Sequence, residues 1–243
     1  MKVAILADIH GNFQALKAVL ADISRLSVDR IFSLGDNIGY GPEPEEVVQS
    51  LIRNGVHSVM GNHELGLASS SYSARFHVTA RDSLHLTRSL LSAASLAWLT
   101  SLPAFSVWED TRFVHGCPPE SMTVYLFNPS ETRLQRVFAA YPESICFAGH
   151  IHDLAWHRME NGAVTSSPLP LGRSDLTGQG RHLFLCGSVG QPRDMFNWHA
   201  KYVLWDQAAA TIEVRDVEYD VQTTVQLLKE RGFPGSNAKR LFW

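Results

Sequence analysis

Apolar runs and amphipathic segments alternate through the first quarter of the chain. Residues 3–7 form a continuous apolar run, which indicates a strand that is buried on both faces. Apolar positions three and four residues apart predict a helix over 13–23. A second strand over 29–34, a helix that opens at Pro42 with glutamates in its first turn, and a third strand over 56–60 follow. This β-α-β-α-β order is typical of parallel strands joined by helical crossovers.

The pattern changes after the third predicted strand. Residues 64–103 are rich in Ser, Ala, Leu and Thr and predict helices over 75–91 and 93–100, which we interpret as an inserted helical part. Two further helices are predicted over 129–140 and 221–231. The remaining predicted elements are strands, over 104–109, 112–115, 145–149, 155–160, 182–186, 202–206 and 211–217.

This order of elements indicates an α/β (α+β) fold class. We expect a four-layer αββα sandwich of two mixed sheets in a single domain over 1–243, with a small helical insert or cap at about 64–103. The Asn161-Gly162 pair favours a tight hairpin turn. Residues 168–180 form the longest predicted loop, and such loops often border functional sites.

Composition and charge narrow the classes of function. The chain has 45% apolar and 19% charged residues, which suits an enzyme with a sizeable core. A net charge of -3 without a basic stripe argues against a duplex nucleic-acid partner. The apolar runs are too short for a secretion signal or a membrane span, and three widely spaced cysteines argue against a disulfide framework. We therefore expect a cytoplasmic protein without a membrane partner.

Candidate metal ligands follow five of the apolar runs, each close to a glycine. Oxygen and imidazole ligands brought together from several strand ends are what a two-metal hydrolytic site requires. A carboxylate has two oxygens and can bridge two metals about 3.5–4 Å apart. In chain order the candidates are Asp8 and His10, Asp36, Asn62 and His63, His115, and His150 and His152.

Each cluster has a structural alternative when it is taken alone. Asp8 or Asn62 could cap a helix, and Asp36 could be a turn residue. A single histidine after an apolar run is more often a core residue than a ligand. Five such clusters at five predicted strand ends are nevertheless hard to explain as independent coincidences, so the pattern favours a metal centre.

The order of the motifs resembles one known family. D-x-H, G-D-x-x-G, G-N-H-E, V-H-G and G-H-I-H follow one another between residue 1 and about residue 194, as in the calcineurin-like metallophosphoesterases. The GDNIGYGP segment and a late GSVGQPRD resemble its compact bacterial and archaeal phosphodiesterase-like branch. The resemblance implies one metal on Asp8, His10 and His152, a second on Asn62, His115 and His150, Asp36 as the bridge, and His63 just outside the ligands as general acid or phosphate contact.

The resemblance also implies a mechanism and its cofactors. Two divalent ions would supply a water whose pKa is lowered from 15.7 toward ~7 as the nucleophile for an in-line attack on phosphorus. His63 would protonate the leaving oxygen. We expect Glu64 to support a histidine of the centre, the alternative being a solvated carboxylate. Mixed nitrogen and oxygen ligands suit manganese, iron, zinc or nickel. We expect manganese, with iron, zinc, nickel or magnesium as alternatives.

Candidate substrate-binding residues lie outside the ligand motifs. Arg193 follows two glycines that allow close approach to a ligand, and its guanidinium could hold a phosphate, although an Arg193–Asp194 pair could instead only pin the loop. Tyr40 is a second candidate. Weaker candidates are Arg173 and Arg181 for phosphate, and Tyr125, Phe127, Phe196, Trp198 and His199 for stacking on a base, with plain packing as the alternative.

These observations predict a metal-dependent phosphoesterase. We expect it to hydrolyse phosphodiester or phosphoanhydride bonds of a small phosphorylated substrate of the nucleotide type, dinucleoside polyphosphates included. Two alternatives stay open: a phosphomonoesterase or protein phosphatase, and a non-catalytic metal-binding scaffold. The sequence carries no sign of the oligomeric state.

Overall fold

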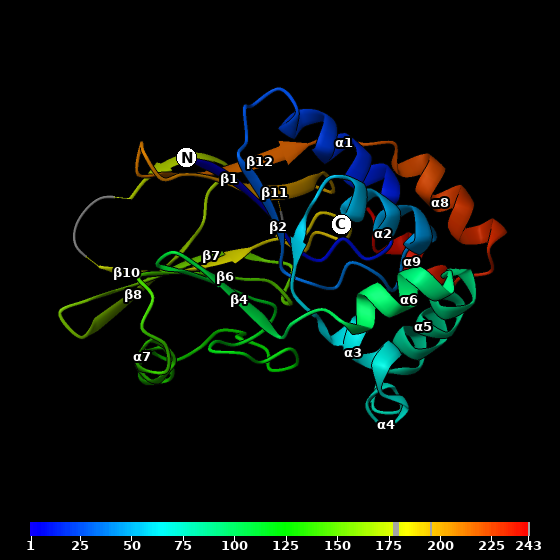
Figure 1. Cartoon of the computed structure of the whole chain (residues 1–243), viewed down its shortest axis with the longest axis horizontal. Helices are drawn as coiled ribbons and strands as arrows, with labels where there is room; N and C mark the ends of the chain where they lie inside the picture. The colour runs from blue at the N-terminus through cyan, green and yellow to red at the C-terminus, as the bar shows by residue number, and fades with distance from the viewer. Residues whose placement is uncertain (177–179, 195, 243) are drawn as a thin grey trace.

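A computed structural model describes residues 1–176, 180–194 and 196–242. In this part of the chain two mixed six-stranded sheets pack face to face, and helices cover their outer faces (Figure 1). The predicted four-layer αββα sandwich is therefore confirmed. None of the described helices is long and apolar enough to cross a membrane.

The first sheet combines the two ends of the chain. Its first three strands are parallel, whereas the other three join in antiparallel fashion. Helices α1 (Phe13–Ile23) and α2 (Pro44–Arg53) are the crossovers between the parallel strands. From edge to edge the order is β3 (His57–Ser58), β2 (Arg30–Ser33), β1 (Lys2–Leu6), β11 (Ala200–Asp206), β12 (Thr211–Val217) and β9 (Gly172–Asp175).

The second sheet comes from the middle of the chain. Three adjacent strands, β5, β6 and β10, are parallel, and α7 (Glu131–Ala139) covers the outer face of the sheet. The hairpin predicted at Asn161-Gly162 joins β7 to β8. From edge to edge the order is β4 (Phe105–Trp108), β5 (Thr111–Val114), β6 (Ile145–Ala148), β10 (Arg181–Cys186), β7 (Leu154–Glu160) and β8 (Ala163–Pro168).

The main core fills the space between the two sheets. Phe113, Phe147 and Phe184 of the second sheet stack in a row with ring centroids 5.7 and 5.4 Å apart. Trp205 of β11 meets this row from the first sheet. Burial of each such side chain contributes roughly 1.5–3 kcal/mol, so the row fixes how the two sheets lie against each other.

A helical group follows β3 and lies beside α2 (Figure 1). Its core is small and includes Leu67, Leu84 and Leu99. The C-terminal helices α8 (Val221–Glu230) and α9 (Gly235–Lys239) follow the last strand. The members of the helical group are α3 (Asn62–Ala68), α4 (Ser70–Ser73), α5 (Val78–Leu90) and α6 (Ala93–Thr100).

Several predicted boundaries were wrong because contacts with distant segments decide where the element begins or ends. The helix expected from Pro42 begins at Pro44. Glu43 is the N-cap residue of this helix, and the backbone N–H of Glu43 donates to the carbonyl of Gly11. The third strand, predicted over 56–60, spans only His57–Ser58. The N–H of Met60 donates to the carbonyl of Pro103, which lies outside the sheet.

The segment 168–180 is not one long loop. Its residues Gly172–Asp175 form β9, which pairs with β12 at the edge of the first sheet, while 177–179 lie outside the described residues. The tail after Pro234 begins with α9, and Leu241 is buried. Phe242 is half exposed, and residue 243 lies outside the described part.

Candidate metal centre

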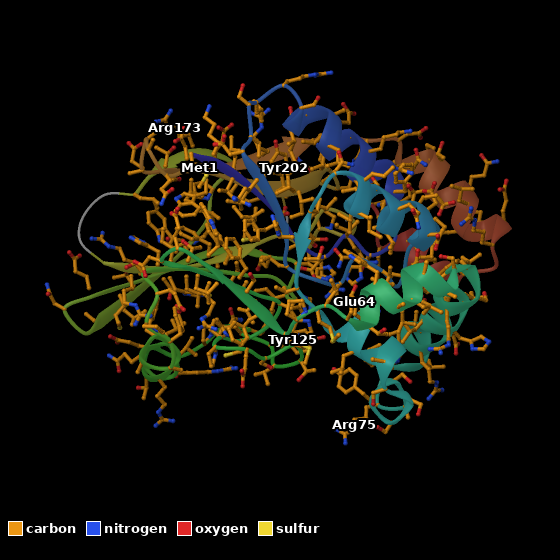
Figure 2. The ribbon with its side chains drawn as sticks, in the orientation of Figure 1. Met1, Glu64, Arg75, Tyr125, Arg173 and Tyr202 are labelled. Atoms are coloured by element: carbon orange, nitrogen blue, oxygen red, sulfur yellow. The ribbon has the colours of Figure 1, made fainter. Side chains whose placement is uncertain are left out.

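The predicted ligands meet where the carboxyl ends of the parallel strands converge. Asp8 follows β1, Asp36 follows β2, and Asn62 opens α3 after β3. His115 follows β5 and His150 follows β6, so the second sheet supplies the other half. Figure 2 labels Glu64 of α3 and Tyr125 at this end of the sandwich, next to the helical group.

The backbone turns sharply at most of the predicted ligands. Asp8, His10, Asp36, His150 and His152 have φ values of 53°, 52°, 48°, 73° and 60°, in the left-handed region that non-glycine residues rarely adopt. Such conformations cost of order 1–3 kcal/mol each and persist where the surrounding structure fixes them, as it does at functional sites. These turns direct the side chains of two sheets into one small volume.

The first cluster contains Asp8, His10 and His152, all buried. Nδ1 of His10 donates to the carbonyl of Ile38 at 3.3 Å, and Nδ1 of His152 donates to that of Gln191 at 2.7 Å. Each ring therefore presents an Nε2 lone pair, and these two nitrogens are 2.9 Å apart. A proton or a cation is needed between two facing lone pairs. Oδ1 of Asp8 lies 3.3 Å from His152 Nε2.

The second cluster repeats this arrangement with Asn62, His115 and His150. Nδ1 of His115 donates to the carbonyl of Leu34 at 2.9 Å, whereas His150 uses Nε2 to donate to Thr123 at 3.3 Å. The remaining nitrogens, His115 Nε2 and His150 Nδ1, face each other at 3.0 Å. Oδ1 of Asn62 lies 3.1 Å from His115 Nε2. This second donor set also suits a cation.

Asp36 lies between the two clusters. Its Oδ2 is 3.8 Å from His10 Nε2 and 3.4 Å from His115 Nε2. Its Oδ1 accepts the backbone N–H of His63 at 2.8 Å. One oxygen of this carboxylate, rather than both, is thus directed at the two clusters.

The charges of the buried centre are strongly coupled. Burial alone would raise the pKa of Asp36, but the imidazoles of His115 and His63 outweigh it and hold that pKa well below its usual range. Burial would lower the pKa of His115, but Asp36 raises it to about 9. Burial and then His115 lower the pKa of His150 to about 3. These shifts favour an ionised Asp36 carboxylate and a positively charged imidazolium at His115, with its charge in the place that a cation would take.

His63 lies beside Asp36 with its ring held by aromatic neighbours. Its Nε2 is 3.9 Å from Asp36 Oδ2, and its buried Nδ1 has no hydrogen-bond partner among the described residues. Tyr40 and Phe76 pack against the ring with centroids 4.7 and 5.2 Å away. A Cβ on Gly39, whose φ is +89°, would lie 2.1 Å from His63 Nδ1, so this close approach requires glycine.

Glu64 does not support a histidine, contrary to the prediction from the sequence. Its fully buried carboxylate accepts the backbone N–H groups of Asp36 at 2.9 Å, Asn37 at 2.8 Å and Gly61 at 2.8 Å. It therefore holds the turn that carries Asp36. Burial, followed by the charge of Asp36, raises the pKa of Glu64 to about 7. Glu64 is the third residue of α3 and accepts the N–H of the N-cap residue Gly61, which is one half of a capping box, and that spacing could have revealed this bond.

Arg193 lies next to the first cluster. Its N–H donates to the carbonyl of His152 at 3.1 Å, and its exposed guanidinium contacts Gln191 Oε1 at 3.1 Å. Asp194 pairs instead with Lys201, 3.5 Å away, so the alternative of an Arg193–Asp194 pair is wrong. Gly190 does not serve approach to a ligand, because a Cβ there would lie 1.8 Å from the carbonyl of Ile9.

The weaker phosphate candidates lie away from the centre. Arg173 on β9 is exposed and is labelled in Figure 2 at the opposite end of the sheets. Arg181 donates to the carbonyls of Phe138, Tyr141 and Glu143, which fixes the end of α7. Arg181 therefore has a structural role, and neither arginine lies at the metal centre.

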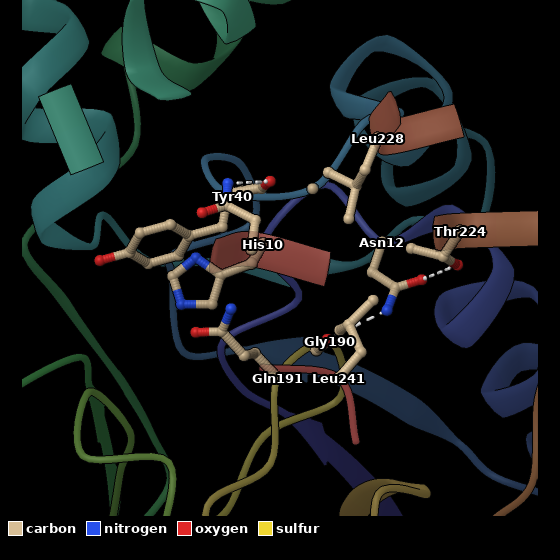
Figure 3. Close-up of a pocket in the computed structure, with 10 residues that line it drawn as sticks. His10, Asn12, Tyr40, Gly190, Gln191, Thr224, Leu228 and Leu241 are labelled. Atoms are coloured by element: carbon tan, nitrogen blue, oxygen red, sulfur yellow. Dashed lines mark hydrogen bonds between the residues drawn. The ribbon is translucent and has the colours of Figure 1, made fainter. Parts of the chain in front are cut away.

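Residues at the back of the centre escaped prediction. A cavity of about 10 Å³, enough for one water, lies behind His10 and Tyr40 and is closed by the C-terminal helices (Figure 3). Asn12 donates to Gly190 at 3.0 Å and accepts from Thr224 of α8 at 3.1 Å. Asn237 donates to the Tyr40 carbonyl at 2.8 Å. No local motif marks these residues, because their partners are distant in sequence.

The comparison with family models decides the family. The model described as calcineurin-like phosphoesterase matches residues 1–154. The chain belongs to this family. The matched segment contains every predicted ligand and His63, and the family uses divalent metal ions.

Two relatives match this chain over almost its whole length, and a third matches about half of it. The uncharacterized protein MJ0912 of Methanocaldococcus jannaschii is 33% identical, over 99% of this chain and 97% of its own. A metallophosphoesterase of Sphaerobacter thermophilus, known from its crystal structure, is 33% identical with a TM-score of 0.85 over 99% and 98% of the two chains. The symmetrical bis(5'-nucleosyl)-tetraphosphatase of Pectobacterium atrosepticum is 30% identical over 118 residues, 47% of this chain and 42% of that protein.

Proposed function

We propose that this calcineurin-like phosphoesterase hydrolyses phosphodiester or phosphoanhydride bonds of nucleotide-type substrates with two divalent metal ions. The observation that carries the proposal is Asp36 Oδ2 between two pairs of imidazole nitrogens that face each other at 2.9 and 3.0 Å. Histidines that only stabilise the fold would not need one carboxylate placed between two such clusters. Two cation sites joined by one carboxylate are the arrangement of dinuclear hydrolases.

The donor atoms divide between two ions. The buried Oδ1 of Asp8 has no hydrogen-bond partner among the described residues, which fits an oxygen reserved for a cation. Divalent cations would supply an activated water nucleophile near neutral pH and positive charge opposite the phosphoryl oxygens. We assign Asp8, His10 and His152 to one ion, Asn62, His115 and His150 to the other, and Asp36 to both.

The residues around these ligands have separate tasks. His63 places an imidazole beside Asp36 without belonging to either facing pair, and we assign it proton donation to the leaving oxygen. Tyr40 packs against the rings of both His10 and His63, and Arg193 follows the loop that holds His152. We assign Tyr40 and Arg193 to phosphate binding at the mouth of the centre.

The similarity to a bis(5'-nucleosyl)-tetraphosphatase supports a nucleotide substrate with a phosphoanhydride bond. That similarity spans 47% of this chain. The metal centre itself is compatible with either an ester or an anhydride, because both reactions displace an oxygen from phosphorus.

The test is turnover by protein stripped of metal and then supplied with one metal at a time. Bis(p-nitrophenyl) phosphate, p-nitrophenyl phosphate and diadenosine tetraphosphate should be compared with manganese, iron, zinc, nickel and magnesium. We expect metal-dependent turnover, at least about tenfold faster on the diester than on the monoester. A preference for the monoester would indicate a phosphomonoesterase, and no turnover with any metal would indicate a metal-binding scaffold.

A further inference from the structure

A cleft of about 650 Å³ opens between the helical group and the loop that follows β5. Tyr72 of α4 and Arg75 lie on the wall formed by the helical group, and residues 117–124 form the other wall. In Figure 2 the labelled Arg75 comes from the α4 side and Tyr125 from the loop between β5 and α7. A cleft of this size falls in the range of small-molecule sites, about 300–1,000 Å³.

Both walls of the cleft reach the metal centre. On the loop side, Thr123 accepts the hydrogen bond of His150, and the Tyr125 ring stacks on the His150 ring at 3.7 Å and 18°. On the helical side, Tyr72 packs edge-to-face on Phe76 at 5.4 Å, and the Phe76 ring lies 5.2 Å from that of His63. Tyr72 of the helical wall is thus two ring contacts from the centre, and Tyr125, which directly follows the last residue of the loop wall, is one ring contact away.

The two tyrosines are suited to stack on a flat ligand. Tyr125 is 53% exposed although one face of its ring lies on His150, so its other face is open. Burial raises the pKa of Tyr72 to about 12, and the nearby Asp36 and Tyr125 contribute in the same direction. Tyr72 therefore stays a neutral ring near pH 7.

Hydrogen bonds within the chain hold the loop that carries Tyr125 in place. Cys117 donates its backbone N–H to Val124 at 2.9 Å, and the guanidinium of Arg133 donates to the Tyr125 carbonyl at 2.6 Å. A ring that is already ordered loses little conformational freedom on binding.

We propose that this cleft binds the nucleoside of a nucleotide substrate, with the base stacked against Tyr72 and Tyr125 while the phosphate lies at the metal centre. The proposal rests on the phosphoesterase function proposed above. Aromatic stacking accepts any base, since every base has a π face. Arg75 adds a positive charge on the same wall as Tyr72, which suits further phosphates, and Glu120 on the opposite wall disfavours them there.

The experiment compares two diesters that release the same leaving group. Metal-loaded full-length protein is assayed with thymidine 5'-(p-nitrophenyl phosphate) and with methyl p-nitrophenyl phosphate. We expect a KM at least about tenfold lower for the thymidine ester, and Tyr72→Ala to raise that KM about tenfold with a smaller effect on the methyl ester. Tyr72→Phe should keep the low KM. Val78→Ala, an exposed apolar residue of α5, is the control and should match the unsubstituted protein.

Binding without turnover gives a second readout. In calorimetric titrations of metal-loaded protein, AMP should bind at least about tenfold more tightly than inorganic phosphate, and Tyr72→Ala should remove most of that difference. Equal KM values for the two esters, or equal affinities for AMP and phosphate, would overturn the nucleoside site while leaving the phosphoesterase intact. Preferential hydrolysis of a phosphotyrosine peptide would also overturn it. If neither ester were hydrolysed, the phosphoesterase proposal would fail. The titrations with AMP and phosphate would still show whether the cleft binds a nucleoside.

Discussion

Asp36 is held from several directions at once. Its backbone N–H is bound by Glu64, its Oδ1 by the N–H of His63, and its φ of 48° is left-handed. These restraints leave Oδ2 directed at both clusters. The bridging role we propose depends on this orientation as well as on the charge.

The first prediction concerns the charge of Asp36. Asp36→Asn keeps the shape of the side chain but removes the negative charge that the two proposed ions share. We expect fewer than one bound metal per chain and a fall in kcat/KM of at least about 10³-fold, since the metals supply the nucleophile. Plasma mass spectrometry after dialysis measures the metal. Asp82→Asn on the exposed surface of α5 is the control, and two ions retained in Asp36→Asn would remove the bridging role.

His63 should affect the reaction without affecting the metals. His63→Ala removes the imidazole beside Asp36 but none of the atoms assigned to the ions. We expect two metals still bound, kcat lower by about 10²–10⁴-fold, and a smaller change in KM. Metal content and steady-state kinetics on a diester measure this. An undiminished kcat would exclude His63 as the proton donor, and lost metal would make it a ligand.

The candidate ligands that the structure brings together could be found in the sequence, because each is adjacent to a strand end and carries its own chemistry. The sequence does not predict the residues that position them. Asn237 and Tyr40 are 197 residues apart, and no periodicity or motif connects them. The spacing of Glu64 from Gly61 is visible in the sequence. Its three backbone donors could not be predicted, because they come together only through the turns at Asp36 and Gly61.

Among the helices and strands, undisturbed periodicity gave correct boundaries. Helices α1 and α6 and strand β12 begin and end where the pattern predicts. Errors arise where contacts with distant segments decide. The third strand is shortened by the bond from Met60 to Pro103, and β9 exists because β12 offers it a partner. Local propensity cannot contain that information.

Helix α9 connects the C-terminal segment to the centre through Asn237. Its side-chain amide donates to the Tyr40 carbonyl at 2.8 Å and to Ser83 Oγ of α5 at 2.9 Å. We expect Asn237→Ala to lower the free energy of unfolding by about 1–3 kcal/mol, because buried acceptors lose their donor. Urea denaturation measures this. Ser83→Ala removes one of the two hydrogen bonds and should lower the free energy of unfolding by less. An Asn237→Ala protein as stable as the parent would show that these bonds do not stabilise the fold.

Strands β7 and β10 carry buried histidines that make the second sheet sensitive to acid. Burial lowers the pKa of His182, and likewise of His157, from 6.5 to about 4. His182 Nδ1 accepts from Trp156 Nε1 at 3.0 Å, which requires the neutral ring. The folded protein therefore keeps this stability above pH 6.5 and loses it as the pH falls toward 4.

His182→Asn should reduce the acid sensitivity. We expect the drop in unfolding free energy between pH 7 and about pH 4.5 to be smaller in this variant by on the order of 2 kcal/mol. Urea denaturation at both pH values measures the drop, and differences between variants cancel the contribution of the metal centre. The exposed His85→Asn is the control. An unchanged drop in His182→Asn would show that its protonation does not oppose folding.

At the scale of the whole molecule, the centre exists only where both sheets meet. The first sheet supplies Asp8 and Asp36, the second supplies His115 and His150, and the inter-sheet core fixes their distance. The fold class was predictable from element order. The motifs also indicated that the two sheets meet at one edge, because candidate ligands from both halves of the chain can form one metal centre only if they lie close together.

The most direct measurement is a crystal structure of the manganese-loaded protein with anomalous scattering at the manganese edge. The account predicts two anomalous peaks about 3.5–4 Å apart, both within bonding distance of Asp36 Oδ2. One peak should contact His10 and the other His115. A single peak, or two peaks of which only one contacts Asp36, would contradict the dinuclear centre.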